Sequence, residues 1–499
     1  MNETLVGQGV SRPLRGTIRN SAQTQRTGLA WPARILLISL FLPWTWHLGS
    51  VAVPPYRLVL VIMVLPCLFR WITGRAGPIR AADVTVLLYC FWCAVSLIVN
   101  HGFEGSITQA GTQFVETAGA YFVARCFIRN ADDFREAIRL LFIIVMILFP
   151  IAISEAVTNR NLLLEALSTF LPIPPIAENE MRWGLRRVQA VLEHPILFGV
   201  VCGSIMAMVH LTLGYGEKAG KRWLRTGLVA ATAFLSLSAG PITALAAQGL
   251  LLLWNWVLRR YEHRWWLLGT GLSTLWILIS ITANRSVPNI FLTNFSFDVD
   301  SAYHRILIWT FGSQSALNHP FFGVGFNRWD RPSWMPNSID MFWLVHAVQY
   351  GIPAAILMLL IFLLPVVTIG LSKSRDDKLV QYRTGYMITM YSFFLVGWTV
   401  HFWNATYVLF IFLLAAGLWI LDVPQMGTQS TAVAPRTKRK SDQRDGSPVA
   451  DHTKVERNRR IHPYQIRRTN VVSAKLRSHE QLCIGTALAL LKDLKEART

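Results

Sequence analysis

Charged side chains are scarce in this chain of 499 residues, of which only 15% are charged and 53% are hydrophobic. Water-soluble globular domains carry about 25% charged residues, so the composition excludes an ordinary soluble fold. Acidic residues are the scarcer kind, with 28 Asp and Glu against 48 Lys and Arg. Apolar runs of about 20 residues, the length that a membrane-spanning helix needs, recur along the chain. The composition therefore predicts an all-α, polytopic integral membrane protein.

Cysteine is also rare, with six residues in the chain, and none of them lies in a long polar connection. Cys90 and Cys93 have the spacing of a redox or metal-binding pair. They lie inside an apolar run without a second pair, so we interpret them as small packing residues and expect no structural disulfide. No group of His, Cys, Asp and Glu has convincing metal-ligand spacing either.

The formal net charge of +20 would suit a nucleic-acid-binding protein. However, the basic residues gather in alternate connections, which is how orientation is encoded in a membrane protein. Residues 422–499 hold 16 Lys and Arg against 8 Asp and Glu, without apolar periodicity that would form a core. We therefore expect a solvated tail attracted to anionic lipid and no nucleic-acid partner.

The apolar runs predict about twelve spans within a membrane domain at residues 34–421. A basic, disordered segment at residues 1–33 precedes this domain, and the basic tail at 422–499 follows it; both termini are expected in the cytoplasm. The spans are expected at 34–53, 57–73, 82–99, 109–128, 137–155, 195–213, 223–239, 241–258, 265–283, 346–371, 384–402 and 404–421. The connections rich in Lys and Arg then all fall on the cytoplasmic side, as the positive-inside rule requires.

Two long connections, at residues 156–194 and 284–345, are expected on the opposite, extracytoplasmic side. They carry eight arginines between them: Arg160, Arg182, Arg186, Arg187, Arg285, Arg305, Arg328 and Arg331. Long loops are translocated largely regardless of charge, so these residues do not overturn the topology. Arginines held at a membrane surface beside many aromatic residues suit an amphiphilic ligand with an anionic head.

Two sets of motifs in these connections resemble a known family. The second connection has Arg305-x-x-x-Trp309, then the run HPFFGVGF at 319–326, and the element YGIP follows at 350–353. The first connection has the run RRVQAVLEHPILFG at 186–199. Together with the spans of 34–421, these motifs resemble the O-antigen ligase and polymerase superfamily. The similarity is greatest to its branch that makes bacterial exopolysaccharides.

The resemblance implies a GT-C-like helical glycosyltransferase in the bacterial cytoplasmic (inner) membrane. Such an enzyme transfers a glycan from undecaprenyl pyrophosphate to an acceptor hydroxyl at the outer face, with inversion and without a metal ion or other cofactor. A polymerase of exopolysaccharide or O-antigen repeats is the leading interpretation, with chain-length and export proteins as implied partners. A ligase acting on another acceptor is one alternative, and a transporter or flippase of the lipid-linked glycan is another.

Arginine suits the leaving group of this reaction, because its planar fork donates hydrogen bonds in pairs and keeps its proton. We predict that Arg187 and Arg305 bind the pyrophosphate, with Arg186 and Arg328 as further candidates. The alternative is that all four are interfacial side chains that extend toward water.

The acceptor hydroxyl needs a group that takes its proton. Ligases of the family carry a His-Asn pair at the place where this chain has Asp340-Met341. Asp340 is therefore the first candidate for a catalytic base, and the missing histidine favours a polymerase over a ligase. Otherwise Asp340 only caps a helix over residues 341–350.

Further candidates are two histidines and a tryptophan. His319, predicted to be catalytic, and His194, predicted to bind substrate, each precede proline at the mouth of an expected span. Each would bind phosphate or shuttle a proton, or else only shape the junction between loop and helix. Trp309 is expected to stack on a sugar ring or to belong to the aromatic belt. Glu116 and Glu155 are expected to be structural.

Overall fold

The computed structural model describes residues 28–49, 51–177, 181–282 and 299–423. The predicted basic segment up to residue 27 and the tail from residue 424 lie outside the described residues, as does the part of the second long connection that contains Arg285. The described chain is mostly helical. Its one sheet is a two-stranded antiparallel hairpin, β1 (Trp46–Leu48) with β2 (Val51–Val53).

Sixteen α-helices are described, with two π-helical segments and one 3₁₀ helix. They are α1 (Trp31–Ser39), α2 (Pro55–Ile72), α3 (Ala81–Phe114), η1 (Val115–Gly119), α4 (Ala120–Phe127), α5 (Ala131–Thr158), α6 (Leu162–Ser168), α7 (Pro195–Ser204), α8 (Met206–Met208), η2 (Val209–Leu213), α9 (Ala219–Phe234), α10 (Ala239–Val257), α11 (Arg264–Thr282), α13 (Val299–Asn318), α14 (Phe342–Tyr350), α15 (Ile352–Leu371), α16 (Asp377–Val396), α17 (Asn404–Ala416) and η3 (Leu418–Asp422).

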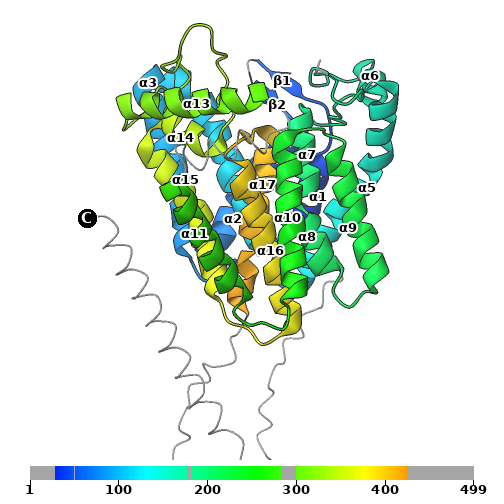
Figure 1. Cartoon of the computed structure of the whole chain (residues 1–499). Coiled ribbons are helices and arrows are strands. Elements are labelled where there is room, and N and C mark those ends of the chain that lie inside the picture. The colour runs from blue at the N-terminus through cyan, green and yellow to red at the C-terminus, as the bar shows by residue number, and fades with distance from the viewer. Residues whose placement is uncertain (1–27, 50, 178–180, 283–298, 424–499) are drawn as a thin grey trace, which may run out of the picture. The chain divides into compact units, whose positions relative to one another are not determined.

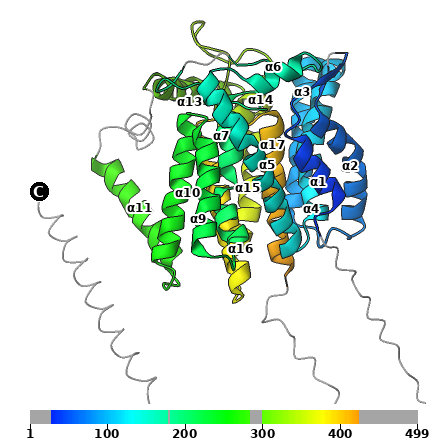
Figure 2. The ribbon, with the colours of Figure 1, turned by 90° about the vertical axis from the view of Figure 1, so that its right-hand side faces the viewer.

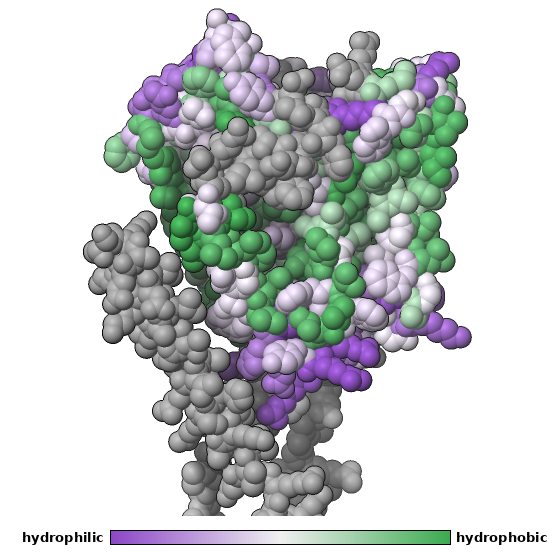
Figure 3. All heavy atoms as spheres, in the orientation of Figure 1, coloured by the Kyte–Doolittle hydropathy of each residue, from purple (hydrophilic) through white to green (hydrophobic). Residues whose placement is uncertain are grey.

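Within the described residues, seven helical segments are long and apolar enough to cross a membrane. In Figures 1 and 2 the long helices stand side by side, whereas α13 lies across one end of them. The face shown in Figure 3 has an apolar band between two polar ends. The coarse prediction of a helical, membrane-embedded protein is therefore confirmed.

The prediction of twelve spans is not confirmed. The helices in the expected ranges 223–239, 241–258 and 384–402, which are α9, α10 and α16, are not among these seven segments, and two further expected spans are not single helices. Residues 34–53 hold the end of the nine-residue α1 and the β1–β2 hairpin. A helix of nine residues is only about 14 Å long, so it cannot cross a hydrocarbon layer about 30 Å thick. Residues 346–371 are divided between α14 and α15 at Gly351, whose φ of 86° ends one helix before the other begins.

The helical segment Ala81–Phe127 is a hairpin, because the backbone leaves helical geometry at Gly102 (φ 71°, ψ 171°). Tyr121 near its end donates a hydrogen bond of 2.7 Å to the Asp83 carboxylate near its start. The two legs must therefore run antiparallel, and they occupy the ranges predicted for two separate spans, 82–99 and 109–128.

Two of the basic connections, those between α2 and α3 and between α4 and α5, meet at one end of the helices. Arg80, Arg125 and Arg129 all form ion pairs with Asp422, which follows the last long helix. Both views show α6 of the first long connection and α13 of the second at the other end (Figures 1 and 2). These basic connections and the two long connections therefore lie at opposite ends of the helices, as the positive-inside pattern predicts.

Candidate functional site

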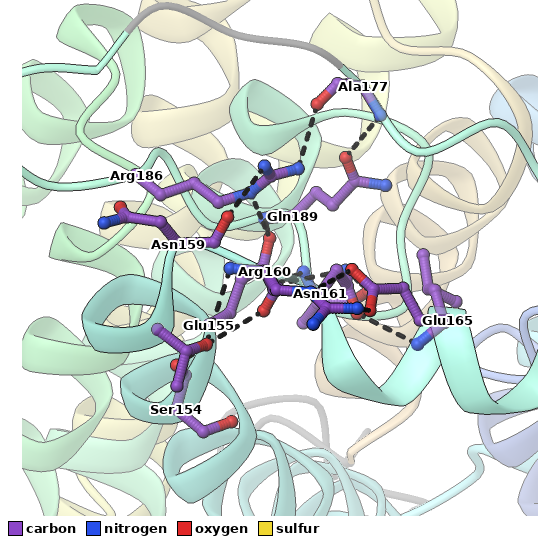
Figure 4. A network of polar contacts seen from close by, with 12 residues as sticks. Ser154, Glu155, Asn159, Arg160, Asn161, Glu165, Ala177, Arg186 and Gln189 are labelled. Carbon is purple, nitrogen blue, oxygen red and sulfur yellow. Dashed lines mark hydrogen bonds and ion pairs between the residues drawn. The ribbon is translucent and has the colours of Figure 1, made fainter.

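Glu155, at the end of α5, fixes the first long connection in place (Figure 4). Its carboxylate accepts hydrogen bonds from the backbone N–H groups of Gln189 (3.2 Å) and Ala190 (2.8 Å). Arg186 forms an ion pair with the same carboxylate at 3.6 Å and donates to the Ala177 carbonyl. Arg186 and Glu155 thus stabilise the loop, and Glu155 has the structural role expected of it.

Arg187, the next residue, reaches the start of α10. Its Nη2 donates a hydrogen bond of 2.9 Å to Oγ of Ser238, the residue that precedes α10. Among the described residues, no side chain accepts from the first backbone N–H groups of α10. The start of a helix carries a partial positive charge and N–H donors without helical partners, so anions are favoured there.

Arg305, on α13, is bound to the connection between α16 and α17. Its Nε donates to the Thr399 carbonyl at 3.1 Å. This connection packs closely on the first turn of α10, since a Cβ at Gly240 would lie 3.1 Å from Thr399 Oγ1 and 3.0 Å from Val400 Cγ2. Arg187 therefore contacts the residue before α10, and Arg305 contacts the segment that packs on the first turn of that helix.

Asp340 lies near Arg305. Burial raises the pKa of its carboxyl group, while the charges of Arg305 and His304 act in the opposite direction. Asp340 has no hydrogen-bond or ion-pair partner among the described residues. It does not cap α14 either, because that helix begins at Phe342 and Met341 occupies the cap position. The capping alternative for Asp340 is therefore wrong.

Trp309 follows Arg305 by one helical turn and is 47% exposed. Its ring meets Trp398 edge to face, with centroids 5.8 Å apart. Trp398 directly precedes Thr399, so this aromatic pair borders the Arg305 contact. Exposed indole faces of this kind suit the apolar face of a sugar ring.

His194 caps α7. Its Nδ1 accepts the Ile196 N–H at 3.2 Å, and its ring lies 6.2 Å from that of Trp403. Burial and the nearby Arg187 lower the pKa of His194 to about 4. The imidazole is therefore neutral at pH 7, which suits a capping acceptor better than a phosphate ligand or a proton carrier.

We predict that His194→Asn preserves the stability of the protein, because asparagine is among the best capping residues. His194→Ala is expected to lose about 1 kcal/mol, since the Ile196 N–H then has no acceptor. Thermal unfolding of the purified variants in detergent measures the difference. Equal melting temperatures for the two variants would contradict the capping role.

His319 and Arg328 lie away from Arg305. His319 follows the end of α13, 14 residues beyond Arg305, which is about 21 Å along the helix. It does not open a span, contrary to the prediction, and its Nε2 lies 3.6 Å from Asp330. Arg328 is exposed and makes no hydrogen bond or ion pair with the described residues. The structure does not bring these two candidates to the site.

The HPFFGVGF and YGIP motifs dock on each other. The N–H groups of Val324 and Gly325 donate to the Val348 and Gln349 carbonyls, each at 2.9 Å. A Cβ at Gly351 would lie 2.0 Å from the Phe321 carbonyl oxygen, so only glycine fits there. These motifs therefore build the junction between α13, α14 and α15.

Sequence reasoning missed the connection at residues 397–404, because it divided this stretch between two adjacent spans. Thr399 binds Arg305, and Trp403 contacts His194, so this connection joins the two long loops. The available signal was the run GWTVHFWN, where a histidine and three aromatic residues interrupt the aliphatic pattern.

An apolar groove of about 770 Å³ begins beside the first long loop. Its lining comes from α5, α8, α9 and α10 and includes Phe149, Ala230, Phe234, Leu235, Ala246 and Gly249. Trp183 of the loop stacks on Phe234 with centroids 6.1 Å apart, and the Val188 N–H donates to the Leu235 carbonyl. The groove therefore ends close to Arg187.

These features define a helical membrane protein with arginines from two loops gathered at one end. Comparison with known proteins adds no assignment: no protein-family model matches the chain, and no curated protein matches it.

Proposed function

We propose that this protein is a membrane-embedded glycosyltransferase that polymerises undecaprenyl-pyrophosphate-linked repeat units at the outer face of the cytoplasmic membrane. The observation that carries the proposal is that Arg187 binds Ser238 at the start of α10, while Arg305 binds Thr399 in the segment that packs on this helix end. Guanidinium groups on two neighbouring segments, one of them beside the uncapped backbone N–H donors of α10, suit an anion with several oxygens.

In the proposed reaction, a hydroxyl oxygen of the acceptor attacks the anomeric carbon of the donor from the face opposite the pyrophosphate. The new glycosidic bond forms as the bond from this carbon to the phosphate oxygen breaks, which inverts the configuration. Arg187 and Arg305 stabilise the charge that develops on the leaving pyrophosphate. Asp340 takes the hydroxyl proton, and no metal ion or other cofactor takes part.

The apolar groove supports a lipid-linked donor. It offers space for a hydrocarbon chain, and its end at Phe234 and Leu235 adjoins the loop that carries Arg187. In addition, a Cβ at Gly249 would meet no atom within 4 Å, so no protein atom fills this part of the groove. A lipid whose tail lies here would place its anionic head near Arg187.

A ligase and a flippase remain the alternatives, and the lipid-linked pool of a deletion strain separates all three. Loss of a polymerase is expected to leave single repeat units on the lipid, accessible to an enzyme added outside the cytoplasmic membrane. Loss of a ligase leaves long chains on the lipid instead. Loss of a flippase leaves single repeats that the external enzyme reaches only after the membrane is opened.

Single, externally accessible repeats in the deletion strain, with polymer restored by the intact gene, would support the polymerase. Either of the other two pools would overturn it. Accessibility is measured by digestion of spheroplasts with a glycosidase, followed by mass spectrometry of the extracted lipids.

A further inference from the structure

A second, smaller pocket lies beside Glu193, the residue that precedes His194. It has a volume of about 30 Å³. Its walls come from the segment after α1, the start of α2, the residues before α7 and the start of α17. The polar and aromatic lining residues are Trp44, Thr45, Tyr56, Glu193, Trp403 and Thr406.

Glu193 is the charged residue of this lining, and its carboxylate accepts hydrogen bonds from neutral side chains. Both of its carboxylate oxygens lie 2.7 Å from Asn404 Nδ2, and the Trp403 side chain also donates to it. Asn404 adopts the left-handed conformation (φ 50°), which is uncommon for a residue other than glycine and is frequent at functional sites. The carboxylate retains room for further hydrogen bonds, since it accepts up to about four.

Two polar groups on the pocket wall have no partner among the described residues. Thr406 is only 1% exposed, and its Oγ1 makes no hydrogen bond. The buried Nε1 of Trp44 likewise has no acceptor. Buried polar groups are rarely left unpaired, because each one costs about 1–3 kcal/mol. A ligand that satisfies both groups supplies an acceptor for Trp44 Nε1 and a donor or acceptor for Thr406 Oγ1.

The floor of the pocket is rigid. Tyr56 donates to the Glu116 carboxylate at 3.1 Å, and Arg57 forms an ion pair with the same carboxylate at 2.7 Å. This pair agrees with the structural role expected of Glu116. It also fixes the charges beneath the pocket, so that the donors and acceptors of the lining keep their positions.

We propose that this pocket is a glycan-binding subsite, in which Glu193 and Thr406 accept or exchange hydrogen bonds with sugar hydroxyls and Trp44 donates one. A sugar edge combines closely spaced hydroxyls with an apolar face, and the pocket combines those same partners with the indoles of Trp44 and Trp403. The volume admits about two water molecules or two hydroxyl groups, so the ring itself lies at the mouth. This inference rests on the proposed function, since it places part of that enzyme's glycan.

The position of Glu193 in the chain places the subsite close to the proposed pyrophosphate site. Glu193 directly precedes His194, and the charge of Arg187 is close enough to His194 to lower the pKa of its imidazole. The subsite is therefore next to the proposed pyrophosphate site but separate from it. A sugar anchored here has its neighbour in the chain directed toward the reacting groups.

The test is calorimetric titration of the purified, full-length protein in lipid nanodiscs. The probe is the oligosaccharide repeat released by mild acid from the lipid-linked pool of a deletion strain. Thr406→Val and Trp44→Phe, which keep shape and remove one polar group each, are expected to weaken binding about five- to tenfold. Glu193→Gln is expected to weaken it at least tenfold. Trp276→Phe is the matched control, because Trp276 is exposed on α11 and does not line the pocket, and it is expected to change nothing.

Titration with undecaprenyl pyrophosphate, which carries no sugar, separates the two proposals. Two results would overturn the subsite. In the first, the lipid binds but the repeat does not; in the second, the lipid binds and the repeat binds equally well to all pocket variants. Water would then fill the pocket. If neither the lipid nor the repeat binds to the unaltered protein, the proposed function itself fails. Weaker binding of the repeat by the pocket variants, with lipid binding unchanged, supports the subsite.

Discussion

Replacing Arg305 or Arg187 with alanine is expected to reduce polymer formation by a factor of about 100 or more. Each guanidinium is proposed to stabilise the charge that develops on the pyrophosphate, and removal of one such donor from other active sites costs about 10²–10³ in rate. Lysine is expected to restore little activity at either position, because it lacks the planar fork that binds two phosphate oxygens. Polymer is quantified from cells that contain equal amounts of each variant in the membrane.

Arg328→Ala is the matched control for both arginines. Arg328 belongs to the same loop as Arg305, but it is exposed and makes no hydrogen bond or ion pair with the described residues. It is expected to leave polymer formation within about twofold of the original, since surface substitutions usually have small effects. Equal loss of polymer in all three variants would contradict the proposal that Arg187 and Arg305, unlike Arg328, bind the pyrophosphate.

Asp340→Asn is expected to lower the rate of glycan transfer by about 10²–10⁴, the usual contribution of a general base. The amide keeps the size of the side chain but cannot take the proton. Burial raises the pKa of Asp340, so its carboxylate is protonated at a higher pH than an ordinary aspartate. As the pH falls, the unaltered enzyme is therefore expected to lose activity at a higher pH than an enzyme whose base has an ordinary pKa. The residual activity of Asp340→Asn is expected to lack this acid limb.

Rates are measured with extracted lipid-linked repeats and purified protein over a range of pH. Asp330→Asn serves as the control, because Asp330 is a carboxylate of the same loop that pairs with His319 at the other end of α13. Full activity in Asp340→Asn, or an unchanged acid limb, would show that another group takes the proton.

The sequence predicted the helical fold from its composition, and it predicted the grouping of basic connections from the positions of Lys and Arg between the apolar runs. It failed at residues 34–53, where an apolar run forms a short helix and a hairpin. Hydrophobicity records that such a segment is buried but not which backbone conformation buries it. It also assigned 346–371 to one span, although Gly351 followed by Pro353 is typical of one helix ending and the next beginning.

At the site, residue chemistry selected four arginines and placed Arg187 and Arg305 first, but it could not show what each of them contacts. Tertiary contacts distinguish them: Arg186 forms an ion pair with Glu155, whereas Arg187 donates a hydrogen bond to Ser238. Likewise, the His-Pro pairs look alike in the sequence, although His194 begins a helix and His319 follows one. Glu193 escaped notice because its partners, Asn404 and Trp403, are more than 200 residues away.

The most direct measurement is the affinity of the purified protein in nanodiscs for undecaprenyl pyrophosphate, with Arg187→Ala, Arg305→Ala and the double variant. If both guanidinium groups bind one pyrophosphate, each single variant is expected to bind about ten- to a hundredfold more weakly, as for the loss of hydrogen bonds to a charged group. The double variant is expected to bind more weakly than either. Unchanged affinity in either single variant would contradict the claim that two external loops together hold the diphosphate.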